Sequence, residues 1–475
     1  MSTNISRRKV VAGAAWAAPV VAASAAVPAF ASSTEREWNS TENYSISGQP
    51  SGARDTLKIT IPAKVDKLRF EVAGGAGGGS AQVAGGSGAL VTGEIPVKAG
   101  QVVELVAAAG GVAYLASEPG VDSAAIWQTR PATGGKGYGN GGDVNEQPVP
   151  ADAKARVEAN APMPSDMKRY LYGGSGGGSS ALIIDGTPIA VAGGGGGAGI
   201  RTQPGTNNMP SSSPFYNPKA VNASTTSLGD TAVKSVLPAG ASASAAAGGD
   251  AETSISHYTV LKPYANERTA MKVAGGKGGN GGVGGAGGEQ PLLYNDANFY
   301  GVLGFTSQNK QELFSSATAG DKGGSGFDGK GADGVFAYSY QIDNNDISKL
   351  EIVHQTNPLN LNEKRPYSEK DTRKSFNGYQ TVVSAGGGAG YGGGGSGAAR
   401  GLSSIITSQK WNANEEPTRY RQNVSALLQA GAGGAGGSYV SPTVPNGIIA
   451  SANNAAKQSG VRNPGYVKVT LCTRS

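Results

Sequence analysis

Residues Gly275–Gly288 read GGKGGNGGVGGAGG, in which two glycines and one variable residue repeat without a slip. The variable positions are Lys277, Asn280, Val283 and Ala286. A period of three fits neither an α-helix nor a β-strand. It is the period of an extended left-handed helix that rises about 3.1 Å per residue. At that rise the stretch predicts one continuous segment of roughly 43 Å.

The composition of the repeat separates two kinds of threefold helix. Collagen requires proline or hydroxyproline in its repeats, and this stretch contains neither. Glycine at two positions in three favours polyglycine II helices packed side by side, because chains without Cβ atoms approach closely and pair N–H and Cα–H groups with neighbouring carbonyls. A packed array of this kind serves as a scaffold. Its predicted structural glycines are Gly275, Gly276, Gly278, Gly279, Gly281, Gly282, Gly284, Gly285, Gly287 and Gly288.

Glycine is clustered along the whole chain, where it accounts for 77 of the 475 residues. The clusters are flanked by β-like segments, whereas a flexible linker needs no such regular flanks. Recurrence of the same unit predicts that the runs pack against one another. The further runs lie near Gly74–Gly88, Gly134–Gly142, Gly173–Gly178, Gly193–Gly199, Gly386–Gly397 and Gly431–Gly437.

The segments between the glycine runs are rich in valine, isoleucine and tyrosine and predict an ordinary β core. Asp185-Gly186 between Ala181–Ile184 and Thr187–Ala192 is a strong hairpin signal. The other predicted elements are a hairpin of Ala89–Val97 with Val102–Ala108 and single strands at Leu57–Pro62, Leu68–Val72 and Tyr466–Leu471.

Long polar inserts form the third kind of segment and carry most of the charge and the aromatic residues. Long loops on a rigid scaffold are where binding usually occurs. Aromatic groups such as Tyr170–Tyr172 and Phe215-Tyr216 either contact a partner or fasten the inserts to the scaffold. The inserts are Ala113–Thr133, Asp143–Leu171, Ile200–Ala247, Glu289–Ala319 and Val335–Thr381.

The N-terminal residues have the pattern of an export signal. Arg7 and Arg8 give a twin-arginine start, and an apolar stretch runs from Val10 to about Val27. Ala29 and Ala31 then supply the small-residue pattern of a cleavage site. A membrane anchor is the weaker interpretation, because alanine dominates the stretch and prolines interrupt it.

We therefore expect residues 1–31 to be a Tat-type signal peptide and residues 32–475 to form a single exported domain. The apolar style of the signal is similar to actinobacterial ones. The sequence contains 40 basic and 34 acidic side chains; removing three basic residues with the signal leaves 37 against 34, or +3. This balance argues against a nucleic-acid partner or a polybasic membrane surface. No second apolar span is present, so we expect no membrane span in the mature chain and a protein that is secreted or non-covalently associated with the cell surface.

Cys472 is the only cysteine, so an internal disulfide is excluded. In the terminal strand, Cys472 shares the face of Lys468 and Thr470, which predicts that this face is wet and the thiol accessible. An intermolecular disulfide through Cys472, linking a homo-oligomer, is one hypothesis. An inert, partly buried thiol is the other.

The motifs that suggest chemistry are weak at this composition. Ser175 lies in a GxSxG match, but a strand follows it where a nucleophile elbow needs a helix. His257 and His354 belong to no recognisable constellation, and the histidines and the single cysteine are too few for a structural zinc site. Gly323–Asp328 matches one calcium-binding nonapeptide where tandem copies are required, and Asp343–Asp346 specifies no ligand geometry. We therefore predict no metal, no cofactor and no enzymatic activity.

The order of these motifs resembles a known family. It runs through FEVAGGAGGG from Phe70, GGSGGGSSALI from Gly173, the threefold repeat, GAGGAGGSYV from Gly431 and a terminal GYVKVTL. It is similar to the glycine-rich domain of the anaplastic lymphoma kinase receptor family and its secreted bacterial relatives. The resemblance implies an all-β fold, in which a TNF-like antiparallel β-sandwich joins a bundle of polyglycine II helices. It covers about Tyr44 to Thr473 but not the inserts, so no ligand-contacting residue is carried over.

The sequence favours an exported structural or interaction scaffold that presents variable loops, with an unknown protein or a surface glycan as the partner of the inserts. The alternative is an adhesin-like or receptor-recognition module. An ice-binding protein would need a uniform face, which Lys277, Asn280 and Val283 do not provide. A secreted hydrolase is the remaining alternative, and the missing constellation disfavours it.

Overall fold

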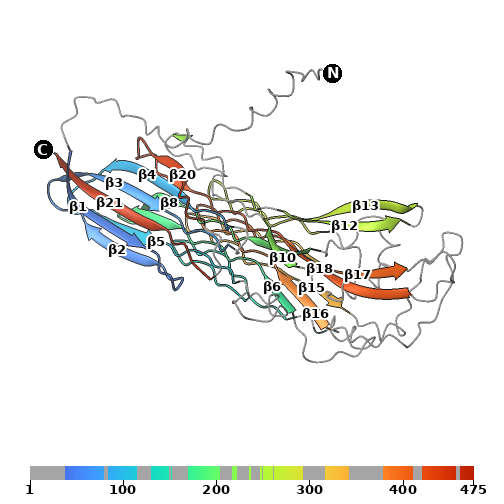
Figure 1. The fold of residues 1–475 in the computed structure, drawn as a ribbon. Coiled ribbons are helices and arrows are strands. Elements are labelled where there is room, and N and C mark those ends of the chain that lie inside the picture. The colour runs from blue at the N-terminus through green and yellow to red at the C-terminus, as the bar shows by residue number, and fades with distance from the viewer. Residues whose placement is uncertain are drawn as a thin grey trace, which may run out of the picture.

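The computed structural model shows an elongated molecule with strands at both ends and a bundle of irregular extended chain between them (Figure 1). It describes residues 38–79, 84–114, 130–148, 151, 169–203, 217–221, 235–236, 247–248, 250–259, 262–291, 316–341, 378–409, 420–455 and 460–474. Within these residues all the regular elements are β-strands, which confirms the predicted all-β class.

Two antiparallel sheets form one end of the molecule, which we call the sandwich end. Sheet A has the strand order β1-β21-β3-β4-β20-β11, and sheet B has the order β19-β8-β7-β5-β2. The strands of sheet A are β1 (Trp38–Ser47), β21 (Tyr466–Arg474), β3 (Val65–Ala73), β4 (Ala89–Pro96), β20 (Ile448–Ser451) and β11 (Ser235–Val236). Those of sheet B are β19 (Tyr439–Val440), β8 (Thr187–Ala192), β7 (Ser180–Ile184), β5 (Val102–Ala107) and β2 (Asp55–Thr60).

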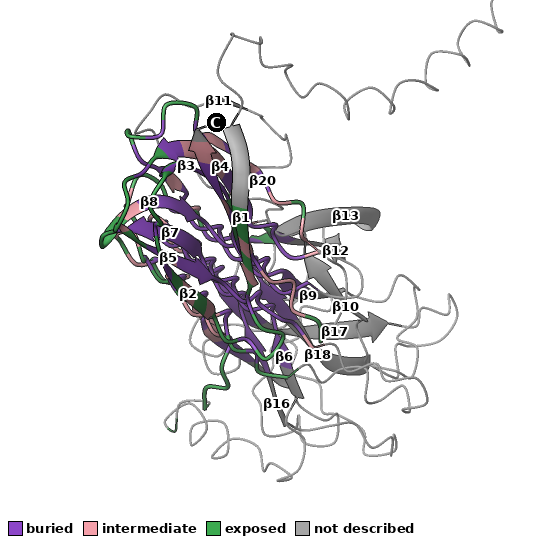
Figure 2. Ribbon diagram, turned by 90° about the vertical axis from the view of Figure 1, so that its left-hand side faces the viewer, coloured by how far each residue is buried: buried purple, intermediate pink, exposed green. Residues whose placement is uncertain are grey.

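The two sheets enclose one apolar core, because alternate residues of each strand point the same way. Sheet A contributes side chains such as Leu68 and Val469, and sheet B contributes side chains such as Leu105 and Leu182, all of them buried. In β21, Val467, Val469 and Leu471 are buried and Lys468 is exposed, which confirms the alternation predicted for this strand. Figure 2 shows buried residues running through both sheets and on into the middle of the molecule.

The predicted hairpin of Ala89–Val97 with Val102–Ala108 is wrong. β4 belongs to sheet A and pairs with β3 and β20, whereas β5 belongs to sheet B and pairs with β2 and β7. The connecting turn instead bonds to Ile61, whose N–H donates to Gln101 O (2.8 Å) and whose carbonyl accepts from Gly100 N–H (2.9 Å). This places β5 beside β2, so the chain crosses from one sheet to the other.

The hairpin predicted around Asp185-Gly186 is confirmed. β7 and β8 pair antiparallel, and the turn residues Asp185 and Gly186 have φ of 50° and 78°. These left-handed values belong to a two-residue hairpin turn, which the Asp-Gly pair favours. The Asp185 carboxylate accepts a hydrogen bond from Val102 N–H (2.8 Å), so the turn also fastens β5.

A second group of strands forms the far end of the molecule. The chain enters and leaves several inserts through strands, whose pairing buries apolar residues such as Leu171, Val382 and Leu428. The sheets are β15-β16-β6, β10-β9-β18-β17-β14 and the pair β12-β13. Their bounds are β6 (Arg169–Tyr172), β9 (Gly199–Gln203), β10 (Asn217–Val221), β12 (Ala251–Thr259), β13 (Lys262–Val273), β14 (Ser316–Thr318), β15 (Phe336–Gln341), β16 (Gly378–Val383), β17 (Ala399–Gln409) and β18 (Tyr420–Ala430). Some of these strands, such as β15 and β10, lie in segments predicted as polar inserts, whereas β12, β13, β17 and β18 lie in segments for which no element was predicted.

Candidate functional site

The glycine runs between the two ends are joined by backbone hydrogen bonds, and we call this body the glycine array. In the run Gly193–Ala198, successive N–H groups donate to different neighbours. Gly195 donates to Gly75 O (3.0 Å), and Ala198, three residues on, donates to Gly78 O (2.9 Å). Likewise Gly194 donates to Ala389 O (2.7 Å) and Gly197 to Gly386 O (2.9 Å). Each neighbour is therefore reached at every third residue, as packed threefold chains require.

The same run accepts hydrogen bonds from further runs on its other sides. Gly195 O accepts from Gly177 N–H (2.9 Å), and Gly194 O accepts from Gly436 N–H (2.9 Å). The bonds therefore radiate to several neighbours, unlike those of a β-strand, which lie in one plane. This pattern agrees with packed polyglycine II helices, although that assignment and the TNF-like topology of the sandwich stay predictions.

Glycine is required in the array because the backbones touch. A Cβ built at Gly194 would meet Gly177 O, and one built at Gly196 would meet Gly433 O, each well inside the 3.0 Å that real Cβ atoms keep. The carbonyl of a neighbouring run fills the place of the missing side chain. Any larger residue at these positions must push two runs apart and lengthen the hydrogen bonds between them.

The stretch Gly275–Gly288 is a hairpin of two short runs, so the prediction of one continuous segment is wrong. Gly281 and Gly282 have φ of 58° and 79°, and Asn280 and Val283 exchange two backbone hydrogen bonds of 2.9 Å. These left-handed values reverse the chain, and glycine adopts them at little cost. The sequence period continues across the turn, so the period alone does not reveal it.

The variable residues of this hairpin line one exposed side of the array. Lys277, Asn280, Val283 and Ala286 are all exposed, and Val283 retains 57% of its surface. Of the predicted structural glycines, six are buried, three are half-buried and Gly281 at the turn is exposed; the buried ones are Gly275, Gly276, Gly279, Gly284, Gly285 and Gly288. Outside the turn, the variable residue of each repeat is thus more exposed than its glycines.

Four aromatic side chains gather where turns of the array meet the sandwich, and we call them the aromatic turn cluster: Tyr138, Phe327, Tyr391 and Tyr439. The Phe327 ring stacks on Tyr391 with centroids 4.7 Å apart and meets the edge of Tyr439 at 4.9 Å. Each of the four is half-buried. Burial raises the pKa of the Tyr138 hydroxyl, and the charges of Asp328 and Glu104 raise it further.

The aromatic turn cluster joins the array to the sandwich. Phe327, Tyr138 and Tyr439 pack against buried residues of sheet B, including Val106 and Ile183, which do not belong to the main core. The outer face of sheet B is therefore covered by the turns of the array.

Polar contacts join the far-end strands to one another and to the array. Arg400 on β17 is 1% exposed and donates from Nε to Gln429 Oε1 on β18 (3.1 Å). Burial lowers the pKa of Arg400 to about 10. Asp250, just before β12, accepts a hydrogen bond from Gly275 N–H (2.9 Å) and pairs with Lys272 on β13. Leu171 and Tyr172 are buried, so these two residues of the Tyr170–Tyr172 group fasten the insert to the scaffold.

Several inserts begin and end on paired strands at the far end. Residues 342–377 connect Gln341 of β15 to Gly378 of β16, which are Cα partners. Residues 204–216 connect Gln203 and Asn217 in the same way. Residues 410–419 connect the partners Gln409 and Tyr420 and form a further insert that the sequence pattern did not indicate. Each of these three loops therefore starts and finishes at one place on a hydrogen-bonded strand pair.

Two residues singled out from the sequence have structural surroundings. Ser175 is fully buried; its Oγ accepts from Val112 N–H (2.9 Å) and lies 2.9 Å from Thr133 O, to which it donates. Cys472 is 1% exposed, so the prediction of an accessible thiol is wrong. It lies opposite Lys67, whose Nζ pairs with Glu94 (2.8 Å), and this pair and Arg69 surround the thiol. Burial raises the pKa of Cys472 and disfavours the reactive thiolate.

Other predicted features lie outside the described residues. These are the signal residues Arg7, Arg8, Ala29 and Ala31, the Phe215-Tyr216 pair, the Asp343–Asp346 turn, His354 and the side chain of His257. Among the residues that the structure describes, no group of three or more His, Cys, Asp or Glu side chains is placed to hold a metal ion. In the same part of the chain, no helix has the length and apolarity to cross a membrane.

Sequence reasoning missed the aromatic turn cluster, although a partial signal is present. Tyr138, Phe327 and Tyr391 each interrupt a glycine-rich stretch, where a bulky residue marks a turn. No family model matches the chain, and no curated protein shows significant sequence similarity to it.

Proposed function

We propose that this protein is an exported scaffold whose glycine array holds a set of variable inserts away from the sandwich, for recognition of a protein or glycan at or beyond the cell surface. In this proposal the chain is a secreted bacterial relative of the glycine-rich domain family named above. Residues 1–31 direct export, and the mature domain is secreted or held non-covalently on the cell.

The observation that carries the proposal is the pairing of the strand ends beneath the inserts. Gln341 with Gly378 closes residues 342–377 at their base, and Gln409 with Tyr420 closes residues 410–419, so the sequences of these two inserts can vary without changing the strands below. The hydrogen bonds of the strand pair offset the conformational entropy that is lost when the two ends of an insert are brought together. This entropy loss grows only slowly with the length of the loop. Such an arrangement suits display of variable loops.

The rigidity of the array supports the same role. The radiating hydrogen bonds of Gly193–Ala198 and the backbone contacts at each glycine leave little room for the runs to slide. A rigid support lowers the entropy cost of binding, because the loop bases are already positioned. In Figure 1 the sandwich and the far-end strands lie at opposite ends of the array.

The test is to remove the inserts without disturbing their bases. Because Gln409 and Tyr420 are partners, residues 410–419 are replaced by Asn-Gly, which favours a two-residue hairpin turn. Residues 342–377 are replaced in the same way between Gln341 and Gly378. A matched control replaces residues 260–261, which already form a two-residue connection between the partners Thr259 and Lys262, by Asn-Gly.

The readouts are the thermal midpoint and the amount of protein retained on washed envelopes of the producing cells, against that in the cleared medium. We expect unchanged midpoints for all variants, retention by the parent and the control, and release of the insert-free variants. Equal retention of every variant, or release of the parent, would argue against display of these inserts at the envelope.

A further inference from the structure

The chain carries two copies of the tetrapeptide Gly-Asn-Gly-Gly, around Asn140 and around Asn280. Asparagine before glycine is chemically labile, because the small following residue lets its backbone nitrogen reach the asparagine side chain. The two copies have identical neighbours on both sides, so their intrinsic reactivity is nearly the same. Both asparagines are also exposed. Any difference between them must come from the backbone geometry.

At Asn140 the reacting groups are held by hydrogen bonds. Gly141 N–H, whose nitrogen would be the nucleophile, donates to Gly135 O (2.9 Å). The Asn140 side-chain Oδ1 accepts from Gly137 N–H (3.3 Å), and its backbone carbonyl accepts from Gly331 N–H (2.9 Å). Gly141 is buried in the array.

At Asn280 the backbone carbonyl accepts a hydrogen bond from Val283 N–H (2.9 Å), but the two groups that react, the Gly281 nitrogen and the Asn280 side chain, are not held in this way. Gly281 is exposed at the tip of the hairpin, and its N–H donates to no acceptor among the described residues. The side-chain amide of Asn280 likewise has no hydrogen-bond partner in the described part of the chain. Gly281 and Gly282, with φ of 58° and 79°, carry no side chain that would hinder rotation at the tip.

We propose that Asn280 is a site of spontaneous backbone modification, selected over Asn140 by the structure. The Gly281 nitrogen loses its proton and attacks Cγ of Asn280. The bond from Cγ to the side-chain nitrogen breaks, and ammonia leaves with the proton. Water then opens the resulting cyclic imide at either carbonyl, which yields aspartate or isoaspartate. No reactant other than water is needed.

The modification acts on a connected turn. Isoaspartate adds one backbone carbon before Gly281, and both products add a negative charge. Gly282 accepts a hydrogen bond from Gly326 N–H (2.8 Å) and donates to Tyr391 O (3.3 Å), so the altered tip adjoins the turns that carry Phe327 and Tyr391. The charge state of this exposed side of the array would thus change with the age of the protein.

The experiment incubates the folded protein at pH 8 and 37 °C and follows both sites by peptide mapping. Trypsin separates them, since Asn140 falls between Lys136 and Lys154, and Asn280 between Lys277 and Lys310. A parallel incubation in guanidinium chloride gives the rate for the unfolded chain. We expect the two sites to convert at equal rates when unfolded and Asn280 to convert at least tenfold faster than Asn140 when folded. Equal rates in the folded protein, or faster conversion at Asn140, would overturn the proposal.

Discussion

Replacement of Gly284 by alanine tests the packing of the array at a single atom. Gly284 is buried, and a Cβ built on it would meet the carbonyl oxygen of Gly323, far inside the 3.0 Å that real Cβ atoms keep. The two runs must separate to accept it. This separation strains the hydrogen bonds from Gly323 N–H to Gly285 O (2.9 Å) and from Gly285 N–H to Gly393 O (2.8 Å).

The magnitude follows from these two effects. Inserting a methyl group into a close-packed site costs about 1–3 kcal/mol, and each strained hydrogen bond adds about 1 kcal/mol. Against this, Gly→Ala stabilises a chain by about 0.4–1 kcal/mol where the backbone tolerates it, because the unfolded state loses entropy. We expect a net loss near 3 kcal/mol, which lowers the thermal midpoint of a domain of this size by about 3–5 °C, because the entropy of unfolding grows with chain length.

The assay is thermal unfolding followed by circular dichroism, with Ala286→Ser as the control. Ala286 occupies the same hairpin and is exposed, so its replacement should change the free energy of unfolding by no more than about 0.5 kcal/mol. If the run were loosely held, Gly284→Ala would raise the thermal midpoint, because alanine lowers the entropy of the unfolded chain. An unchanged or raised midpoint would therefore refute the packed array.

Four further expectations follow from side-chain contacts. Burial raises the pKa of Asp250, but hydrogen bonds from Lys272 and Gly275 N–H outweigh it and hold the pKa below its ordinary value. Its stabilising contribution is therefore present above about pH 4 and is lost as the pH falls through the lowered value, so Asp250→Asn should flatten the acid dependence of the unfolding midpoint. Cys472 should react with a thiol reagent slowly in the folded protein and fully in denaturant, with a monomer band on a non-reducing gel; a dimer band removed by reductant would contradict its burial. Phe327→Ala removes a half-buried ring and its contacts with Tyr391 and Tyr439, at an expected cost of about 2–3 kcal/mol by denaturant unfolding, whereas a neutral result would place the ring outside the packed junction. Gln429→Leu removes an acceptor of the buried Arg400 guanidinium, and a cost of about 1.5–3 kcal/mol is expected in the same assay.

The sequence predicts part of the strands and the packing of the glycine runs, because both follow from short-range patterns. The predicted strands are β2, β3, β4, β5, β7, β8 and β21. Alternation in Tyr466–Leu471 predicts the buried face of β21, and Asp185-Gly186 predicts the β7–β8 turn. In Gly275–Gly288 the variable residue of each repeat is exposed, together with Gly281 at the turn. In each case a local rule decides the outcome.

Features that depend on distant contacts are not predictable in this way. The connection from β4 to β5 has hairpin length, yet bonds to Ile61 send β5 to the other sheet. The chain reverses at Gly281 and Gly282 without any break in the sequence repeat. The turn is therefore visible only in the structure, where hydrogen bonds to neighbouring runs hold it. Cys472 shares a face with the exposed Lys468, but the Lys67 and Glu94 pair across the sheet buries it.

Several strands of the far end were missed for a related reason. The segments around β17 and β18 mix serine, threonine and glutamine with apolar residues, which weakens the alternation that marks a strand. Their pairing is set by register, with Gln409 opposite Tyr420. The candidate display site depends on this pairing. The sequence therefore indicated polar inserts, but it did not show that strand pairing joins the two ends of a loop.

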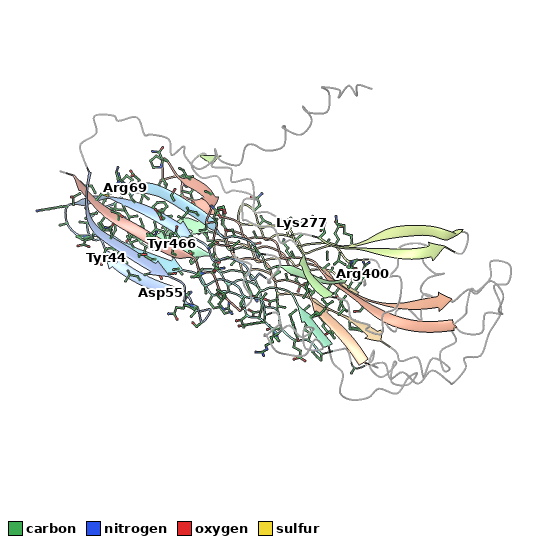
Figure 3. All side chains as sticks on the ribbon, in the orientation of Figure 1. Tyr44, Asp55, Arg69, Lys277, Arg400 and Tyr466 are labelled. Atoms are coloured by element: carbon green, nitrogen blue, oxygen red, sulfur yellow. The ribbon has the colours of Figure 1, made fainter. Side chains whose placement is uncertain are left out.

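In Figure 3, labelled Lys277 lies on the array and labelled Arg400 lies where the far-end strands begin. In the proposed function, the rigidity of the array fixes the position of these strands.

Hydrogen exchange measured by mass spectrometry tests the rigidity of the array most directly. We predict that the hydrogen-bonded amides of the runs Gly193–Ala198 and Gly431–Gly437 exchange as slowly as those of β21, since they are buried and donate to neighbouring runs. They include the amides of Gly194, Gly195, Gly197, Ala198, Gly433, Gly434 and Gly436. Exchange of these glycine amides at the rate of an unstructured chain, with β21 protected, would contradict the account of a rigid array.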